Sequence, residues 1–319
     1  MAREGFLGFV LALVLGIAAS LIAKQVKGLD PLVAAVVLGL AASIVVGARD
    51  QIYFKVAPGI ILAQAIFIPI GIALYGKNLE IKVMLASSPW VFLQVIGITG
   101  LTFVLMFWLG KLFGFNDRMR YLLGFGSAIC GASAIAIASP VLEAEPNDTA
   151  TGLVDNTIAA VISMYLLATF VMPHVLPREY AGAAGALLHQ TGFVKMSLAG
   201  KAKDILEFGV VVKSLRVVLL VLAIPTVSYL IRKRVFIPWY LVLFVVVAVV
   251  FSYVPLGPVV ANGVTNVYEV CFTAALVSIG MNANFLHVFK RLFKPLVLIM
   301  LVFLLDLAVW WFTHGLIRY

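Results

Sequence analysis

The chain has 319 residues, of which 63% are hydrophobic and 12% are charged, and its mean hydropathy is +1.12. A soluble domain carries about twice this share of charged residues, so the composition excludes an ordinary soluble protein and indicates a polytopic membrane protein. The net charge of +9 does not point to nucleic acid, because Lys and Arg stand singly or in short groups between apolar runs. The two cysteines, Cys130 and Cys271, both lie within apolar runs, so no disulfide framework is expected.

Apolar runs of about 17 to 25 residues are long enough for a helix to cross the hydrocarbon core. The candidates are residues 5–23, 31–47, 58–76, 89–110, 120–142, 150–175, 180–199, 206–231, 236–254, 262–282 and 295–316. The sequence therefore predicts an all-α polytopic membrane protein with ten or eleven transmembrane segments in a single domain, residues 1–319. The segment at 180–199 is the weakest, because it is rich in small and polar residues, and it either spans the membrane or forms a re-entrant hairpin.

The distribution of Lys and Arg between the connecting loops predicts the orientation. If every segment spans and the N-terminus is cytoplasmic, basic residues on the cytoplasmic side, Arg3 and Arg49 among them, outnumber those outside, Lys27 and Arg318 among them, by roughly two to one. A cytoplasmic N-terminus and an external C-terminus are therefore expected. The first apolar run has no convincing small-residue cleavage site and is expected to be the first span.

The run GFGSAICGASAIAIASPV, residues 124–141, is long enough to span but is interrupted by glycines and small polar residues. Such a pattern favours a broken helix, which is tolerated at membrane depth only inside protein or beside a watery cavity. The break would place Ser127, Cys130, Gly131 and Ser133 at a binding site, with Ser133 as the N-cap of the second half-helix. The alternative is close helix packing, which small residues also permit.

A second group of small residues precedes polar ones at 182–191, which ends in His189, Gln190 and Thr191. These residues indicate either a second broken helix or an interhelical hydrogen bond from a buried histidine. The pair Asp155 and Asn156 lies near the start of another span. Asp155 either binds a coupling cation or proton, or is solvated near the outer end of its segment.

Lys213 and Arg216 stand three residues apart inside an apolar span, so they share one helix face and need a counter-charge. An anionic substrate would supply it, or a carboxylate would form a structural ion pair, and the sequence leaves both open. Glu269 and Asp306 are single carboxylates in late spans and are further coupling-ion candidates.

Signatures of enzymes are lacking in the sequence. There is no Walker loop, no zinc-protease or serine-hydrolase motif, and no metal-ligand spacing of Cys or His. The chain is therefore expected not to be an enzyme and to need neither metal nor cofactor.

The segment at 124–141 resembles the signature segment of the YeiH-like membrane proteins, also called the sulfate exporter family. The resemblance continues in order through LDPLVAAVVLGL, AGALLHQT, VVKSLRVVLLV and the late span ending SIGMN, and so covers most of the chain. It implies a secondary transporter of sulfate or a related sulfur oxyanion such as sulfite, located in the cell (inner) membrane. Through its distant similarity to cation/proton antiporters and bile-acid symporters, it also implies inverted repeats, two crossing broken helices and an elevator-like motion.

One residue departs from the family pattern. An acidic residue tends to follow the histidine in this family, whereas Gln190 follows His189 here. The departure either removes a coupling carboxylate or moves its role to Asp155.

Together these observations predict a secondary active exporter of a small anion, working by alternating access. Ser127, Cys130, Gly131 and Ser133 would offer donors to the anion, with His189, Gln190 and Thr191 opposite, and Lys213 and Arg216 would balance its charge. A passive anion channel and a proton- or sodium-coupled transporter of small organic anions are the alternatives. The expected partners are the anion, a coupling proton or sodium ion, the lipid bilayer and, as an open alternative, a second copy in a homodimer; nucleic acid is not expected.

Overall fold

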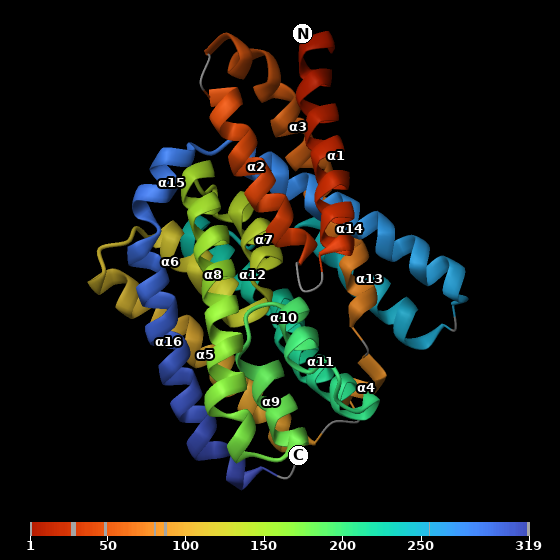
Figure 1. Ribbon diagram of the computed structural model, residues 1–319, viewed down its shortest axis with the longest axis vertical. Coiled ribbons are helices and arrows are strands. Elements are labelled where there is room, and N and C mark those ends of the chain that lie inside the picture. Colours follow the sequence, from red (N-terminus) through yellow and green to blue (C-terminus); the bar gives the residue numbers. More distant parts are fainter. Residues whose placement is uncertain are drawn as a thin grey trace. The chain divides into compact units, whose positions relative to one another are not determined.

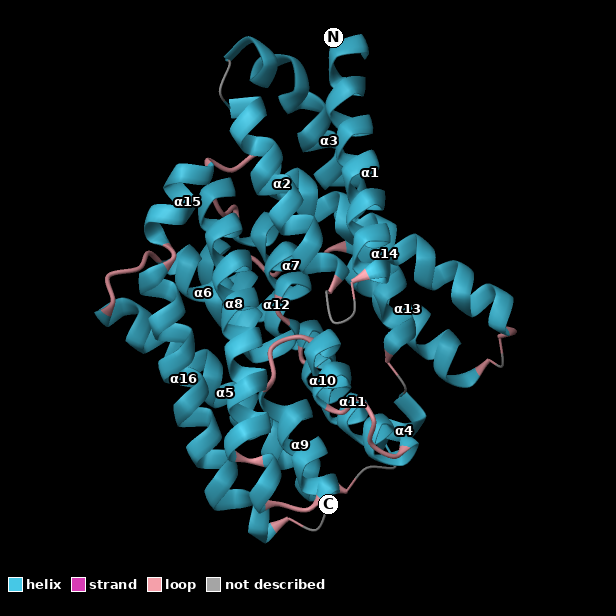
Figure 2. Cartoon of the chain, viewed as in Figure 1, coloured by secondary structure: helices cyan, strands magenta, loops and turns pink. Residues whose placement is uncertain are grey.

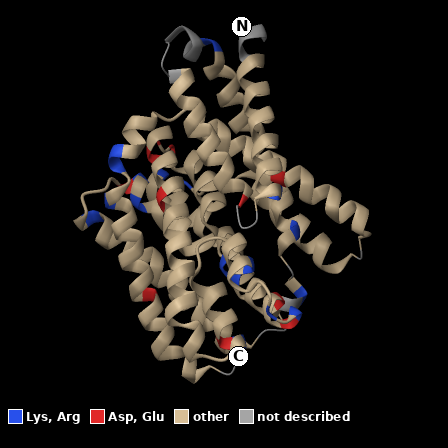
Figure 3. Cartoon of the chain, in the orientation of Figure 1, with Lys and Arg blue, Asp and Glu red and all other residues tan. Residues whose placement is uncertain are grey.

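Every described element of the computed structural model is helical, which confirms the predicted all-α class (Figure 2). The structure describes residues 2–26, 30–47, 50–79, 81–85, 88–254 and 256–317. Seven helices in these ranges are long and apolar enough to cross a membrane, and three shorter apolar helices accompany them. Long stretches of the helices carry no charged residue of either sign, as expected for a polytopic membrane protein (Figure 3).

The chain folds into two compact units, each built from separated stretches of sequence. Unit 1 comprises residues 1–77, 143–154 and 237–292. Its helices are α1 (Ala2–Gln25), α2 (Pro31–Gly47), α3 (Asp50–Tyr75), α13 (Trp239–Tyr253), α14 (Pro258–Met281) and α15 (Phe285–Arg291). It also holds the first part of α8 (Pro146–Phe170).

Helix α14 packs against α1, α2 and α3 in unit 1 (Figure 1). The approach to α2 depends on two glycines, because a Cβ added at Gly39 would lie 2.5 Å from the carbonyl oxygen of Val277, and one added at Gly280 would lie 2.8 Å from the backbone of Gly39. Close backbone contact through small residues is how helices associate in membranes, where lipid gives no hydrophobic drive.

Unit 2 comprises residues 78–142, 155–236 and 293–319 and contains the rest of α8. Its other helices are α4 (Ile81–Leu85), α5 (Pro89–Leu112), α6 (Asp117–Phe125), the π-helical turn η2 (Gly126–Cys130), α7 (Ala132–Leu142), α9 (Pro177–Leu187), α10 (Thr191–Ser197), α11 (Lys203–Val218), α12 (Leu220–Arg232) and α16 (Phe293–Thr313). Short 3-10 turns lie at Gly76–Asn78 (η1), Met172–His174 (η3) and His314–Leu316 (η4).

An apolar core joins α5, α6, α8 and α16 within unit 2. Its buried members are Met106, Met119, Leu123, Ala159, Leu298, Ile299 and Val302. A separate contact packs α11 against α9 and α10 (Figure 1). Gly185 and Gly209 allow it, since a Cβ on Gly185 would lie 2.5 Å from the carbonyl oxygen of Gly209.

The predicted segments agree with the helices to within about five residues, except that α3 begins at Asp50, eight residues before the predicted segment 58–76, and with three refinements. The segments at 120–142 and 180–199 are each two helices separated by a break, and the segment at 206–231 is divided at Leu219 into α11 and α12. The predicted inverted repeat, the cytoplasmic N-terminus and the single domain stay predictions. Among the residues used for orientation, Lys27, Arg49, Arg318 and the side chain of Arg3 lie outside the described part of the chain.

Candidate functional site: two broken helices crossed by two cations

The first break follows α6, which passes into the π-helical turn η2 and stops at Gly131. Gly131 has φ +74° and ψ −131°, a backbone conformation open to glycine almost alone. The chain then restarts as α7 at Ala132. π-Turns inside helices recur at functional sites, and this one leaves the first N–H groups of α7 without carbonyl partners in their own helix.

The second break separates α9 from α10. Leu188 and Gln190 have extended backbone, with ψ of 139° and 143°, so the α9 carbonyls end at an open turn before Thr191 begins α10. Gln190 is 3% exposed and meets the first break, because a Cβ added at Gly131 would lie 2.3 Å from Gln190 Cγ. The two breaks predicted from sequence therefore lie against each other.

Helix α8 joins this contact through two hydrogen bonds made by side-chain amides. Asn156 Nδ2 donates to Ser127 Oγ over 3.3 Å, and Gln190 Nε2 donates to Thr157 Oγ1 over 3.2 Å. The other amide atom of each side chain is buried without a hydrogen-bond partner. Since a hydroxyl can donate as well as accept, either end of each amide can be turned toward the break, which gives the site two adaptable polar groups.

Lys213 on α11 binds both breaks at once. Its ammonium donates to the carbonyl oxygens of Ile129 at 2.7 Å, Leu188 at 2.7 Å and His189 at 2.8 Å, which uses all three of its N–H donors. The side chain is 0% exposed. Helix C-termini carry partial negative charge, so the ammonium compensates the carbonyl ends of both first half-helices.

Arg216, one turn further along α11, makes the same kind of bridge with its guanidinium. Nε donates to Ala128 O at 2.7 Å, Nη1 donates to Ala186 O at 2.8 Å and to Leu188 O at 3.0 Å, and Nη2 donates to Ser127 O. The fixed fork of the guanidinium suits two chain ends at once. The two cations thus hold the breaks together through seven hydrogen bonds to backbone carbonyl oxygens.

These contacts refine the sequence expectation about the counter-charge. The alternative of a structural ion pair is not found, since none of the ion pairs within the described ranges involves Lys213 or Arg216. Carbonyl oxygens take that place for Lys213, and sequence spacing gave no signal for them because the partners lie 24 to 84 residues away. Arg216 has four of its five N–H groups engaged and lies near enough to Asp306 for their charges to interact.

The predicted N-cap role of Ser133 is wrong. Gly131 ends the first segment and α7 starts directly after it, so Ser133 lies in the first turn of the helix. Its hydroxyl turns back to Cys130, 3.0 Å from the sulfur and 3.2 Å from the carbonyl oxygen. Both residues remain buried beside the break.

Two further sequence candidates are buried in unit 2. Asp155 is 0% exposed and neither carboxylate oxygen has a partner, which contradicts the alternative that it is simply solvated. His189 is buried with its Nδ1 unpartnered, its carbonyl bound by Lys213, and its ring centroid 6.1 Å from that of Phe303 on α16. An uncompensated carboxylate at this depth needs a proton or a cation, so Asp155 keeps its candidate role in coupling.

The two remaining candidate carboxylates belong to different units. Asp306 on α16 belongs to unit 2 and accepts a 2.7 Å hydrogen bond from Thr102 Oγ1 on α5. Glu269 on α14 belongs to unit 1 and is partly exposed. Thr191 begins α10 next to Gln190, and no cluster of three potential metal ligands is found within the described residues.

Comparison with known proteins matches a family model over residues 7–299, described as conserved hypothetical protein 698. A UPF0324 membrane protein of Archaeoglobus fulgidus is 30% identical over 93% of this chain and 88% of its own. UPF0324 membrane proteins of Staphylococcus aureus and Lactobacillus johnsonii are each 27% identical, over 76% and 89% of this chain and the same shares of their own. No solved structure matches. The resemblance seen in the sequence is thereby confirmed, and the chain belongs to the YeiH-like, or UPF0324, family of membrane proteins.

Proposed function

We propose that this protein is a secondary active transporter of a small anion, working by alternating access. The site is the place where the break at Gly131 meets the break at Leu188–Gln190, which we call the crossing. The observation that carries the proposal is the pair of buried cations, Lys213 and Arg216, which meet the breaks without an ion-paired carboxylate among the described residues. Broken helices in membranes are the usual framework of a transporter's binding site.

The charge balance of the crossing supports an anion. Two cations contribute two positive charges, while the carbonyl ends of two half-helices offset about half a charge each and the starts of α7 and α10 add about half a charge each. The net charge of these groups is therefore positive before any carboxylate is counted. An anion entering the crossing from water would meet a field that favours it.

The beginning of α7 and the amides of Asn156 and Gln190 are the proposed contacts for that anion. α7 has eleven residues, and its first N–H groups start at the Gly131 break. The amides are buried beside them with one unpartnered atom each. Ser127, Cys130, Ser133, His189 and Thr191 complete the proposed lining, whereas Lys213 and Arg216 act mainly through the carbonyls that they hold.

The finer parts of the proposal rest on the family resemblance. They are a sulfur oxyanion such as sulfate or sulfite as cargo, export as the direction, the cell membrane as location and an elevator-like motion as mechanism. The unpartnered carboxylate of Asp155 supports coupling to a proton or another cation. No chemical conversion of the anion is proposed.

Thermal unfolding in detergent tests the binding step. A ligand that binds only the folded protein raises the midpoint, by about 2.7 kcal/mol of stability at a hundredfold excess over its dissociation constant. The panel is sulfate, sulfite, thiosulfate, phosphate, small carboxylates and small sulfonates. We expect one class of oxyanion to raise the midpoint, and Gln190→Leu to remove that rise. Gln64→Leu on α3, in unit 1, is the matched control and should keep it.

Two outcomes would overturn the proposal or its mechanism. If no anion shifts the midpoint, or if Gln190→Leu responds like the parent chain, the anion site is not at this crossing. If an anion does bind, counterflow in liposomes separates a transporter from a channel, since only a carrier exchanges labelled for unlabelled anion against the label's own gradient. Absence of counterflow would contradict the carrier mechanism.

A further inference from the structure

A row of polar groups runs along the contact between α5 and α16 in unit 2. We call it the polar seam and define it by its residues: Gln94, Thr99 and Thr102 on α5, and Asp306, Trp310 and Thr313 on α16. The α16 members follow one helix face at spacings of four and three. From Asp306 to Thr313 the helix rises about 10 Å, so the seam covers roughly a third of a bilayer core.

Hydrogen bonds connect α5 and α16 at the two ends of the seam, whereas polar atoms between these ends have no hydrogen-bond partner. Gln94 Nε2 donates to Thr313 Oγ1 over 2.9 Å, and Thr102 Oγ1 donates to Asp306 Oδ2 over 2.7 Å. Between them, Thr99 Oγ1, Trp310 Nε1 and Asp306 Oδ1 are buried without partners. Buried polar atoms are rarely left unpaired, and three along one line indicate a place for water or a moving proton.

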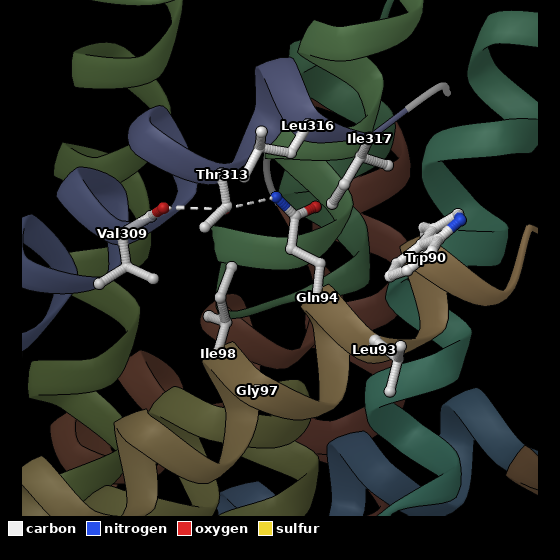
Figure 4. A pocket seen from close by; sticks show the side chains of 9 residues that line it. All are labelled: Trp90, Leu93, Gln94, Gly97, Ile98, Val309, Thr313, Leu316 and Ile317. Carbon is white, nitrogen blue, oxygen red and sulfur yellow. Dashed lines mark hydrogen bonds between the residues drawn. The ribbon is translucent and has the colours of Figure 1, made fainter.

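The outer end of the seam opens into a pocket of about 460 Å³ (Figure 4). Gln94 and Thr313 line the pocket together with Trp90 and Leu316. His314, partly exposed on the turn η4, stacks on Trp310 with ring centroids 4.8 Å apart. A pocket of this volume has room for several waters.

The inner end of the seam approaches the crossing of the breaks. Phe303 stands one turn before Asp306 on α16 and packs on the ring of His189. The charged group that interacts with Asp306 is Arg216 on α11, and α5 faces Asp306 with the Thr102 hydroxyl. His189, after α9, packs on Phe303 and is the nearby titratable group on that side. Helix α8 contacts α16 through Ser163 and Met300, and the part of α8 that belongs to unit 2 carries the buried Asp155.

We propose that the polar seam conducts protons between the outer pocket and Asp306, and that a proton on Asp306 and an anion at the crossing bind together. This inference rests on the proposed function. In the step itself, a hydronium in the pocket releases its proton to water in the seam. The proton passes along the chain to Asp306 Oδ1, where an O–H bond forms and the carboxylate loses its charge.

The sign of the coupling follows from Arg216. An ionised Asp306 opposes the positive field that Arg216 gives the crossing, and a protonated one does not. Anion binding is therefore stronger when Asp306 carries a proton, and by reciprocity a bound anion favours protonation. Anion affinity must then fall as pH rises, by at most about tenfold per pH unit for one linked proton.

Sulfate binding by thermal shift and by calorimetry, on either side of neutral pH, tests the site. In the parent chain we expect the affinity to fall as pH rises. Asp306→Asn keeps an oxygen that can accept from Thr102 but removes the titration of this side chain, so its sulfate affinity should depend less on pH than that of the parent and lie closer to the parent's acid value. Asp204→Asn changes an exposed carboxylate at the start of α11 and should retain the pH dependence.

Proton entry with sulfate, followed by a pH-sensitive dye in liposomes, tests the route. Trp310→Phe removes the indole N–H and keeps an aromatic ring, so we expect slower proton entry with unchanged sulfate affinity. This variant also carries the test if Asp306→Asn does not fold. Sulfate affinity that is pH-dependent to the same extent in Asp306→Asn, or unchanged proton entry in Trp310→Phe, overturns the seam while leaving the anion site intact. No sulfate binding at any pH overturns the proposed sulfate site and this coupling with it.

Discussion

At the scale of the residue, Gly131 is the position on which the first break depends. Its positive φ costs a non-glycine residue about 1–3 kcal/mol, and an added Cβ would lie 2.3 Å from Gln190 Cγ. We expect Gly131→Ala to displace the Gln190 amide, to lower the thermal midpoint by a few degrees, and to abolish the midpoint rise that an anion produces. The measurement is unfolding of the purified variant with and without the stabilising anion.

The matched control is Gly100→Ala on α5. A Cβ at Gly100 would meet nothing within 4 Å, and alanine favours a helix over glycine by about 1 kcal/mol, so its midpoint should stay or rise. An intact anion response in Gly131→Ala would show that the glycine serves packing and not the site.

At the scale of the element, α11 acts as a clamp on two half-helices. Lys213 holds carbonyls of both breaks, and its loss leaves buried acceptors unpaired at about 1–3 kcal/mol each. We expect Lys213→Met to loosen the first break and to speed maleimide labelling of the buried Cys130 several-fold. Cys271, equally buried on α14 in unit 1, is an internal control whose labelling rate should not change. Equal acceleration at both cysteines would indicate general unfolding, and no acceleration at either would refute the clamp.

The elements also show which features a sequence can predict. Length and apolarity locate the spans, since a membrane helix is a local property. The breaks are predictable too, because Gly131 and the small residues before Gln190 alter the backbone locally. Lys213 and Arg216 could be recognised as buried cations, but not their carbonyl partners, because every backbone carries carbonyls and nothing in the sequence marks which become exposed at a break. The prediction that Ser133 is the N-cap was wrong for a similar reason, because the break at Gly131 makes the helix begin two residues earlier than predicted.

At the scale of the whole molecule, the arrangement in the membrane depends on whether α9 and α10 together cross it. The segment from Pro177 to Ser197, including the break, has 21 residues, and a continuous helix of this length would be about 30 Å long, enough to cross the membrane. The excess of Lys and Arg in one set of loops predicts that Arg178 is cytoplasmic and Lys201 external. A re-entrant hairpin would place both on one side.

Two single substitutions decide between these arrangements. His174→Cys and Lys201→Cys lie at exposed positions on either side of the α9–α10 segment, and the native cysteines are buried, so the parent chain gives the background. If the segment spans and the N-terminus is cytoplasmic, a membrane-impermeant maleimide should label Lys201→Cys in intact cells and His174→Cys only after the membrane is opened. Labelling of both from one side would make the segment re-entrant, and the C-terminus would then lie on the same side as the N-terminus. Labelling in the opposite sense would keep the span and reverse the orientation, so that the loops richer in Lys and Arg would face outward, against the charge rule that predicts them inside.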